Sequence, residues 1–210
     1  MRTRIKICGL RDPAHARLAA SEGADAIGLV FHPASPRFVA VEEAMRVMAE
    51  LPPFVMAVGL FVDTPEAEIR AVLARVRLDV LQFHGEETPD ECERYGVPYL
   101  RAVRMEEGVD LVEYAHRFSR AKALLLDAHV PGIPGGTGRR FDWGRIPREL
   151  PIPIVLSGGL DPENVGQAIR ETRPWAVDVS SGVESQRGVK DPARITAFIR
   201  SVQREDVRPA

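Results

Sequence analysis

Residues 152–162 read IPIVLSGGLDP, and this stretch predicts the repeating unit of the fold. Ile152–Ser157 is an apolar run of strand length, and near-continuous apolar strands are expected where both faces of a parallel sheet are covered. Asp161-Pro162 is typical of a helix start, because the aspartate side chain accepts a backbone N–H and proline is already bent for the first turn. The stretch therefore predicts a buried β-strand that leads through a glycine turn into a helix.

Seven more apolar runs of this kind lie along the chain, and each predicts another buried strand. The eight predicted strands are Arg4–Cys8, Ala26–Phe31, Val55–Phe61, Val80–Phe83, Tyr99–Val103, Ala123–Asp127, Ile152–Ser157 and Ala176–Ser180. Segments with helical spacing of apolar residues separate these strands. The predicted helices are Pro13–Glu22, Val41–Glu50, Pro65–Arg75, Pro89–Tyr95, Val109–Arg117, Pro162–Glu171 and Pro192–Arg204, with a shorter candidate at Trp143–Ile146.

The alternation of strands and helices indicates the fold class. Repeated βα units favour a parallel sheet with right-handed crossovers, and eight units of about 26 residues each favour a single (β/α)8 TIM barrel. An open, doubly wound parallel sheet is the alternative. This α/β barrel is predicted to span residues 1–204, and residues 205–210 are expected to form a frayed C-terminal tail.

The 210 residues have the composition of an ordinary soluble domain, with 45% hydrophobic and 28% charged residues. No apolar run approaches the roughly 18 residues of a membrane span. The N-terminal sequence MRTRIKICGL lacks the apolar core of a signal peptide. Two cysteines, Cys8 and Cys92, are too few for a disulfide framework. These features predict a cytoplasmic protein that has no membrane partner.

The net charge of −2 and the lack of a basic block argue against a nucleic-acid partner, which would need clustered positive charge. The histidines and acidic residues show no ligand spacing such as HxH or HExxH, so no metal site is predicted. No GxGxxG motif follows the first strand, so the sequence predicts no dinucleotide cofactor. Monomeric and homodimeric barrels share this pattern, and both assemblies fit the sequence.

Two chemically reactive residues close predicted strands, at the end of a barrel where function lies. Cys8 ends the first strand and is a candidate base or nucleophile, with a small buried core residue as the alternative. Lys6 shares its face by period two, and the Lys6 ammonium is a candidate to lower the pKa of the thiol. Asp127 ends the apolar sixth strand and is a candidate general acid, with a purely structural carboxylate as the alternative.

Polar residues at two further strand ends are candidates for substrate binding. Arg37 follows the second strand in a loop stiffened by Pro33 and Pro36, where it suits a planar carboxylate; a solvated surface arginine is the alternative. Gln82 and His84 share one side of the fourth strand by period two. His84 is a candidate for orienting a substrate, or a structural histidine.

Glycine-rich turns follow the last two strands and predict a phosphate site. Their backbone N–H groups can approach an anion closely, at the usual phosphate position of such barrels. The candidate residues are Gly158 and Gly159 after the seventh strand and Ser180, Ser181 and Gly182 after the eighth. The segment PGIPGGTGRR at residues 131–140 is a candidate loop for covering a ligand, and it has no Walker motif.

The sequence resembles the phosphoribosylanthranilate isomerase family in short motifs that cover nearly the whole chain in the family order. The matching segments are Lys6–Leu10, Phe31, Ser35–Arg37, Val58–Phe61, Gln82–Gly85, Leu125–Asp127, Gly135–Gly138, Phe141–Trp143, Gly158–Leu160, Asn164–Val165, Asp178–Glu184, Gly188 and Lys190–Asp191. KICG at 6–9, SPR at 35–37 and DVSSGVE at 178–184 are together highly specific. Phe83 replaces a usual leucine and Ser157 a common alanine, and neither change removes a proposed catalytic group.

The resemblance implies an intramolecular oxidoreductase, of the aldose–ketose isomerase type, in L-tryptophan biosynthesis. It implies conversion of N-(5-phosphoribosyl)anthranilate to 1-(2-carboxyphenylamino)-1-deoxyribulose 5-phosphate by an Amadori rearrangement, with a small phosphorylated substrate and no metal or cofactor. By the same resemblance, Cys8 is expected to be the general base, Asp127 the general acid, and Arg37 the partner of the anthranilate carboxylate. Gln82, His84 and Asp178 are expected to bind substrate, and the glycine turns to hold its phosphate.

Three rival interpretations share the barrel. The related isomerase of histidine biosynthesis resembles this chain at the phosphate turns but uses an aspartate where this chain has Cys8. A pentose-phosphate epimerase would need a metal cluster that the sequence does not predict. A barrel that only binds sugar phosphates is the third, and the presence of both acid and base positions argues against it.

Overall fold

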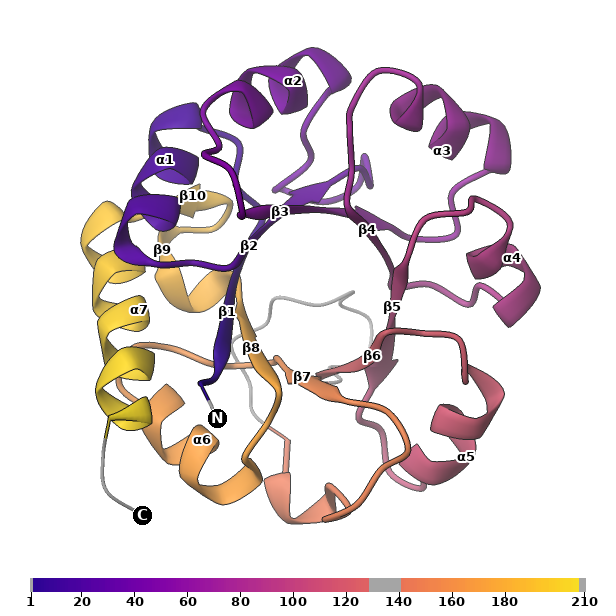
Figure 1. Cartoon of the computed structure of the whole chain (residues 1–210), viewed down its shortest axis with the longest axis vertical. Helices are drawn as coiled ribbons and strands as arrows, with labels where there is room; N and C mark the ends of the chain where they lie inside the picture. Colours follow the sequence, from indigo (N-terminus) through magenta and orange to yellow (C-terminus); the bar gives the residue numbers. More distant parts are fainter. Residues whose placement is uncertain (1, 129–140, 208–210) are drawn as a thin grey trace.

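In the computed structural model, which describes residues 2–128 and 141–207, eight parallel strands form a closed barrel in chain order (Figure 1). The first strand pairs with both the second and the eighth, which closes the sheet. Helices ring the outside of the barrel. This arrangement confirms the predicted (β/α)8 barrel and rules out the open sheet.

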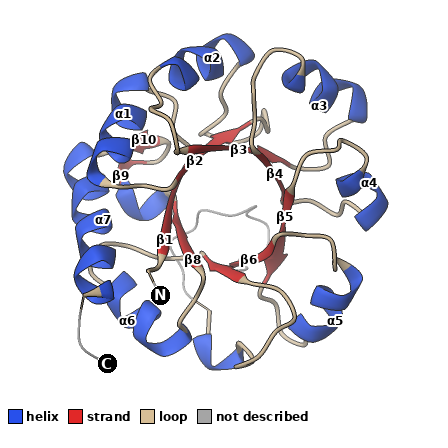
Figure 2. Cartoon of the chain, viewed as in Figure 1, coloured by secondary structure: helices blue, strands red, loops and turns tan. Residues whose placement is uncertain are grey.

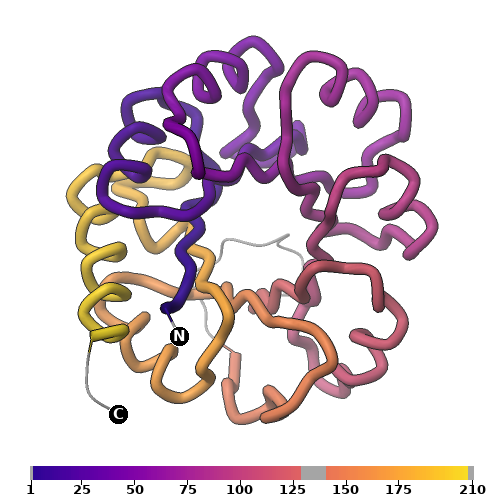
Figure 3. Tube along the Cα trace, viewed as in Figure 1, coloured from indigo at the N-terminus to yellow at the C-terminus, as the bar shows by residue number. Residues whose placement is uncertain are grey.

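Every predicted strand is found, with ends within two residues of the expected positions. The barrel strands are β1 Arg4–Cys8, β2 Ala26–Val30, β3 Met56–Phe61, β4 Val80–Phe83, β5 Tyr99–Arg104, β6 Ala123–Asp127, β7 Ile154–Leu156 and β8 Ala176–Val179. The tube in Figure 3 follows the chain once around the barrel, so that the indigo first strand meets the orange eighth.

The helices that follow the strands are α1 Pro13–Glu22, α2 Val41–Ala49, α3 Glu66–Leu73, α4 Pro89–Glu93, α5 Leu111–Arg117, α6 Val165–Thr172 and α7 Pro192–Asp206, with 3-10 turns η1 Trp143–Arg145 and η2 Ser181–Val183. Four of these helices, α1, α2, α4 and α7, begin at the predicted residue. Asp12 caps α1 by accepting the backbone N–H of Ala14, and Asp191 caps α7 in the same way. No helix in the described part of the chain is long and apolar enough to cross a membrane.

All the helices except α1 differ from the prediction by one to three residues at one end or both, and two of these differences have a clear cause. The Asp161 carboxylate accepts the backbone N–H groups of Glu163 and Asn164, which forms a separate turn, so α6 begins three residues after the predicted Pro162. Helix α7 ends two residues later than predicted, because the Asp206 carboxylate accepts hydrogen bonds from the backbone and hydroxyl of Thr3. Residues 208–210 of the predicted tail lie outside the described residues.

A short antiparallel hairpin after η2 was not expected from the sequence. Its strands are β9 Glu184–Gln186 and β10 Val189–Lys190, and they pair with each other but not with the barrel. Figure 2 places the hairpin beside α1, just before α7 begins. The hairpin follows the η2 turn, which itself comes just after the carboxyl end of β8.

The inside of the barrel changes character along its axis. One part is apolar and includes Leu100, Ala102, Leu125 and Val155. Toward the carboxyl ends of the strands the inward positions become polar, and the buried polar residues there are Lys6, Gln82, Asp127, Ser157 and Asp178. Larger apolar clusters pack between the strands and the helices. The barrel therefore has an apolar base beneath a polar site.

The apolar base should determine stability. Leu125 is fully buried among these residues, so Leu125→Ala is expected to lower the free energy of unfolding by about 2–5 kcal/mol through lost burial and a new cavity. Urea denaturation would measure this loss. Val112→Ala on the exposed side of α5 is the control, expected to change stability by about 0.5 kcal/mol or less. Equal effects of the two changes would contradict the proposed packing.

Candidate active site

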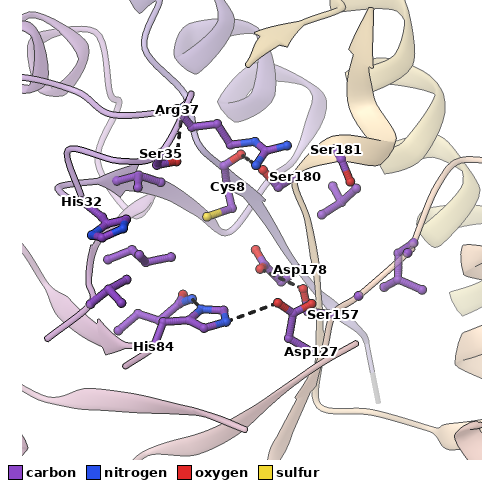
Figure 4. Close-up of a pocket in the computed structure, with 18 residues that line it drawn as sticks. Cys8, His32, Ser35, Arg37, His84, Asp127, Ser157, Asp178, Ser180 and Ser181 are labelled. Atoms are coloured by element: carbon purple, nitrogen blue, oxygen red, sulfur yellow. Dashed lines mark hydrogen bonds and ion pairs between the residues drawn. The ribbon is translucent and has the colours of Figure 1, made fainter. Parts of the chain in front are cut away.

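A pocket opens at the carboxyl ends of the strands and brings together most of the predicted site residues (Figure 4). The predicted residues that line it are Cys8, Arg37, Gln82, His84, Asp127, Gly158, Gly159, Asp178, Ser180 and Ser181. They come from both halves of the sequence, and the closure of the barrel places them around one space. Gly182 does not line the pocket. The candidate covering loop at residues 131–140 lies outside the described residues.

Cys8 lies at the end of β1 beside a buried ion pair. Lys6 Nζ donates a hydrogen bond of 2.7 Å to Asp178 Oδ1, and both side chains are about 5% exposed. The Ser157 hydroxyl donates to the other oxygen of Asp178 at 3.2 Å. Asp178 is therefore held by two partners, Lys6 and Ser157.

The electrostatic surroundings of the Cys8 thiol act in opposite directions. Burial raises the pKa of Cys8 above its ordinary value of 9.0, and the positive charges of Lys6 and Lys190 lower it by smaller amounts. The expected effect of Lys6 is present, but burial outweighs it. Cys8 is therefore mainly a thiol at neutral pH in the free protein, and its thiolate is correspondingly basic once formed.

Asp127 lies at the end of β6 with a histidine beside it. His84 Nε2 is 3.2 Å from Asp127 Oδ2, and Gln82 Nε2 is 3.3 Å from His84 Nδ1. When the Gln82 amide donates to Nδ1, the remaining proton of the neutral ring is on Nε2 and faces Asp127. His84 is thus a direct partner of the predicted acid, a contact that strand periodicity alone does not reveal.

Arg37 is not a solvated surface arginine. Its side chain is 10% exposed, and its Nε and Nη2 donate to the two carboxylate oxygens of Glu184 at 2.6 and 2.9 Å. Lys190 Nζ donates to Glu184 Oε1 at 2.9 Å and to the backbone oxygen of Ser180 at 2.8 Å. Burial opposes the Glu184 charge, but hydrogen bonds from Arg37 and Lys190 lower the pKa of Glu184 to about 2.

Sequence reasoning did not select Glu184 or Lys190 as site residues, although both belong to the matching motifs. The hairpin that carries them has strands of three and two residues, too short to produce a periodic pattern. The signal that the sequence did offer was Glu184 itself, a charged residue at the end of the DVSSGVE motif. It was passed over because the residues just before it had already been predicted to bind phosphate.

The glycines after β7 and β8 have steric reasons to be glycine. Gly158 has a φ of +76°, and a side chain there would collide with the backbone nitrogen of Ala128. A side chain on Gly182 would collide with the backbone oxygen of Leu160. Gly182 therefore lets the two turns pack together, while Gly158 and Ser181 line the pocket. This packing places both turns beside the same pocket, which suits an anion because the backbone N–H groups of glycine-rich turns can bind one.

Metal ligation finds no support in the described part of the chain, where no group of three or more histidine, cysteine or acidic side chains could hold an ion. The groups that line the pocket instead offer a thiol, a carboxylate with a histidine partner, a guanidinium and two glycine turns. That set can donate a proton, accept a proton and bind two anionic groups.

The comparisons with known proteins agree on one family. The family model described as N-(5'phosphoribosyl)anthranilate (PRA) isomerase matches residues 5–201. The N-(5'-phosphoribosyl)anthranilate isomerase of Nitrosococcus oceani is 54% identical over 202 residues, which cover 96% of this chain and 98% of that protein. The isomerase of Alcanivorax borkumensis is 50% identical over 211 residues, which cover 97% of each.

Solved structures give the same result. Phosphoribosyl anthranilate isomerase from Thermotoga maritima superposes with a TM-score of 0.87 at 40% identity, covering 96% of this chain and 98% of that one. A phosphoribosyl anthranilate isomerase in complex with reduced 1-(o-carboxyphenylamino)-1-deoxyribulose 5-phosphate superposes with a TM-score of 0.84 at 39% identity and the same coverage. This chain is therefore an enzyme that belongs to the N-(5'-phosphoribosyl)anthranilate isomerase family.

Proposed function

We propose that the protein converts N-(5'-phosphoribosyl)anthranilate to 1-(2-carboxyphenylamino)-1-deoxyribulose 5-phosphate, with Cys8 as general base and Asp127 as general acid. One observation carries the assignment of roles: a buried thiol and a buried carboxylate, from β1 and β6, line the same pocket. In Figure 4 both side chains point into that space. An aldose-to-ketose rearrangement needs one group of each kind beside a single sugar.

The first step opens the sugar ring. Asp127 gives its proton to the ring oxygen, the bond from that oxygen to C1′ breaks, and the nitrogen lone pair forms a C1′=N⁺ iminium. Asp127 is left as a carboxylate, and a neutral His84 with its proton on Nε2 would donate a hydrogen bond to that carboxylate at the observed 3.2 Å. His84 is therefore proposed to stabilise the acid after it has given up its proton.

The second step moves hydrogen from C2′ to C1′. The Cys8 thiolate removes the C2′ proton, the C–H electrons form C1′=C2′, and the iminium nitrogen recovers its lone pair. The Asp127 carboxylate then accepts the enol hydroxyl proton, the O–H electrons form C2′=O, and the C1′=C2′ electrons take up a proton from the Cys8 thiol at C1′. This gives the ketone and restores both Asp127 and Cys8 to their starting states. The iminium charge formed in the first step favours the thiolate, adding to the positive charges of Lys6 and Lys190.

The remaining pocket residues are proposed to bind the two anionic ends of the substrate. Arg37 suits the planar anthranilate carboxylate, because a guanidinium presents parallel N–H donors in a matching fork. The turns that carry Gly158, Gly159, Ser180 and Ser181 line the pocket at the ends of β7 and β8 and suit the phosphate. Gln82 and Asp178 also line the pocket and are proposed to contact the ribose.

The catalytic roles can be tested by two substitutions. Cys8→Ala and Asp127→Asn are each expected to lower kcat by about a hundredfold or more, because each removes a proton-transfer group. Binding of the reduced product analogue, measured by calorimetry, should stay within about fivefold of wild type, since neither group is proposed to bind an anionic end of the ligand. Cys92→Ala is the matched control, because the Cys92 side chain is buried in α4 outside the pocket. Near-wild-type turnover in either site variant would overturn the role of that residue.

The protonation of Cys8 gives an independent test. In a Cys92→Ala background Cys8 is the sole cysteine, and its alkylation rate by iodoacetamide follows the thiolate fraction. Because its pKa is raised, the rate should still be climbing at pH 9.0. Lys6→Met removes a charge that lowers this pKa, so the climb should shift to higher pH. A plateau below pH 8, or a shift to lower pH in Lys6→Met, would contradict the described electrostatics.

A further inference from the structure

We infer that Glu184 is a positioning residue that holds the Arg37 guanidinium in one orientation, and that it thereby sets the preference of the site for a substrate with an aryl carboxylate. The inference rests on the proposed function, because it assigns a second residue to the recognition of the anthranilate ring. Nothing in the proposed proton transfers requires Glu184. Glu184 does not line the pocket that Cys8 and Asp127 share, and it lies on the β9–β10 hairpin.

The geometry of the pair leaves one edge of the guanidinium available. Arg37 has five N–H donors, and Glu184 takes the one on Nε and one on Nη2. Three donors remain, and two of them lie parallel on the Nη1–Nη2 edge. That edge matches a carboxylate, and Arg37 belongs to the pocket lining. Glu184 therefore determines which edge of Arg37 is left for a ligand.

Glu184 is itself fixed from several directions. Its side chain is 4% exposed, and it accepts hydrogen bonds from Lys190 Nζ at 2.9 Å and from the backbone N–H of Gly188 at 3.0 Å. A side chain at Gly188 would lie 2.6 Å from the backbone oxygen of Pro36, so the hairpin packs directly against the loop that carries Arg37. The hairpin and the Arg37 loop therefore pack together as one unit.

The charges of this unit do not cancel. Arg37 and Lys190 are two buried cations that share one carboxylate, Glu184. The neighbouring Lys6 and Asp178 already neutralise each other. Burial lowers the pKa of Lys190 below its ordinary value, and the charge and hydrogen bond of Glu184 offset part of this. With both cations charged, these buried side chains carry one more positive than negative charge, and a ligand carboxylate would balance it. Removal of Glu184 would leave two cations repelling each other, and Arg37 would lose its fixed orientation.

The test compares two ligands that differ only in the carboxylate. One is reduced 1-(2-carboxyphenylamino)-1-deoxyribulose 5-phosphate, and the other is the same compound with a plain phenyl ring. Calorimetry gives the ratio of their Kd values, which isolates the contribution of the carboxylate from that of the phosphate and sugar. Wild type should bind the carboxylate compound about tenfold or more tightly, as expected for a paired, charged hydrogen bond.

Glu184→Gln should reduce this ratio by about tenfold while the Kd of the phenyl compound stays within about threefold of wild type. For the natural substrate, KM should rise by a similar factor and kcat should change little. Gln186→Ala, an exposed position on the same hairpin, is the matched control and should keep the wild-type ratio. Glu184→Asp, which keeps the charge but shortens the reach to Arg37, should also lower the ratio and serves if the glutamine variant does not fold.

The contrary outcomes distinguish failure of the positioning role from failure of the proposed function. A wild-type ratio in both Glu184 variants would overturn the positioning role. An equal loss of both ligands in folded variants would also overturn it, because that result indicates a general structural role. If wild type bound neither ligand, the proposed function itself would fail, and if it bound both equally, Arg37 would not recognise the carboxylate.

Discussion

Pairing between β1 and β8 closes the barrel, and the site depends on this seam. The register sets Lys6 beside Asp178 and Ile7 beside Val179, so that Cys8 ends β1 close to Ser180. The buried Lys6–Asp178 ion pair crosses the seam. A buried ion pair stabilises a fold little more than apolar side chains of similar size would. A misaligned register, however, would leave both charges buried and unpaired, at a cost of several kcal/mol. The pair therefore specifies the register more than it stabilises the fold.

The charged groups of the polar interior are tolerated because they have partners, whereas the buried Gln82 Oε1 has none among the described residues. Asp178 accepts two hydrogen bonds, Asp127 lies beside His84, and Glu184 is shared by two cations. Groups paired in this way lose little freedom when a ligand arrives, so binding and proton transfer need only small rearrangements. The apolar base around Leu125 supports them from below, which separates residues that stabilise the barrel from residues that act on a ligand.

Much of the fold and most of the pocket could be predicted from the sequence, because both follow from strand periodicity. Strands buried on both faces stand out as apolar runs, and parallel strands place their final residues at one end, which is why Cys8, Arg37 and Asp127 could be grouped before any coordinates. The start of α6 was misplaced because Asp-Pro forms a turn as readily as a helix cap, and the choice depends on Asn164 packing nearby.

Features that depend on distant contacts could not be read from the sequence. The β9–β10 hairpin is too short for a pattern, so the contact of Glu184 with Arg37, 147 residues apart, appears only in three dimensions. The direction of the pKa shift of Cys8 could not be predicted either. The spacing shows that Lys6 shares the face of Cys8, but it does not show how deeply the thiol is buried. Gly182 was assigned to the pocket by its motif, whereas its close packing against Leu160 decides its role.

The most direct test of the account uses the purified wild-type protein and freshly generated N-(5'-phosphoribosyl)anthranilate. Loss of substrate fluorescence would be followed against spontaneous decay in buffer, with chelator present, and the product identified by mass and chromatography. The account predicts catalytic conversion to an isomer of unchanged mass, the carboxyphenylamino deoxyribulose phosphate. Decay no faster than in buffer, from a folded and monodisperse sample, would contradict it.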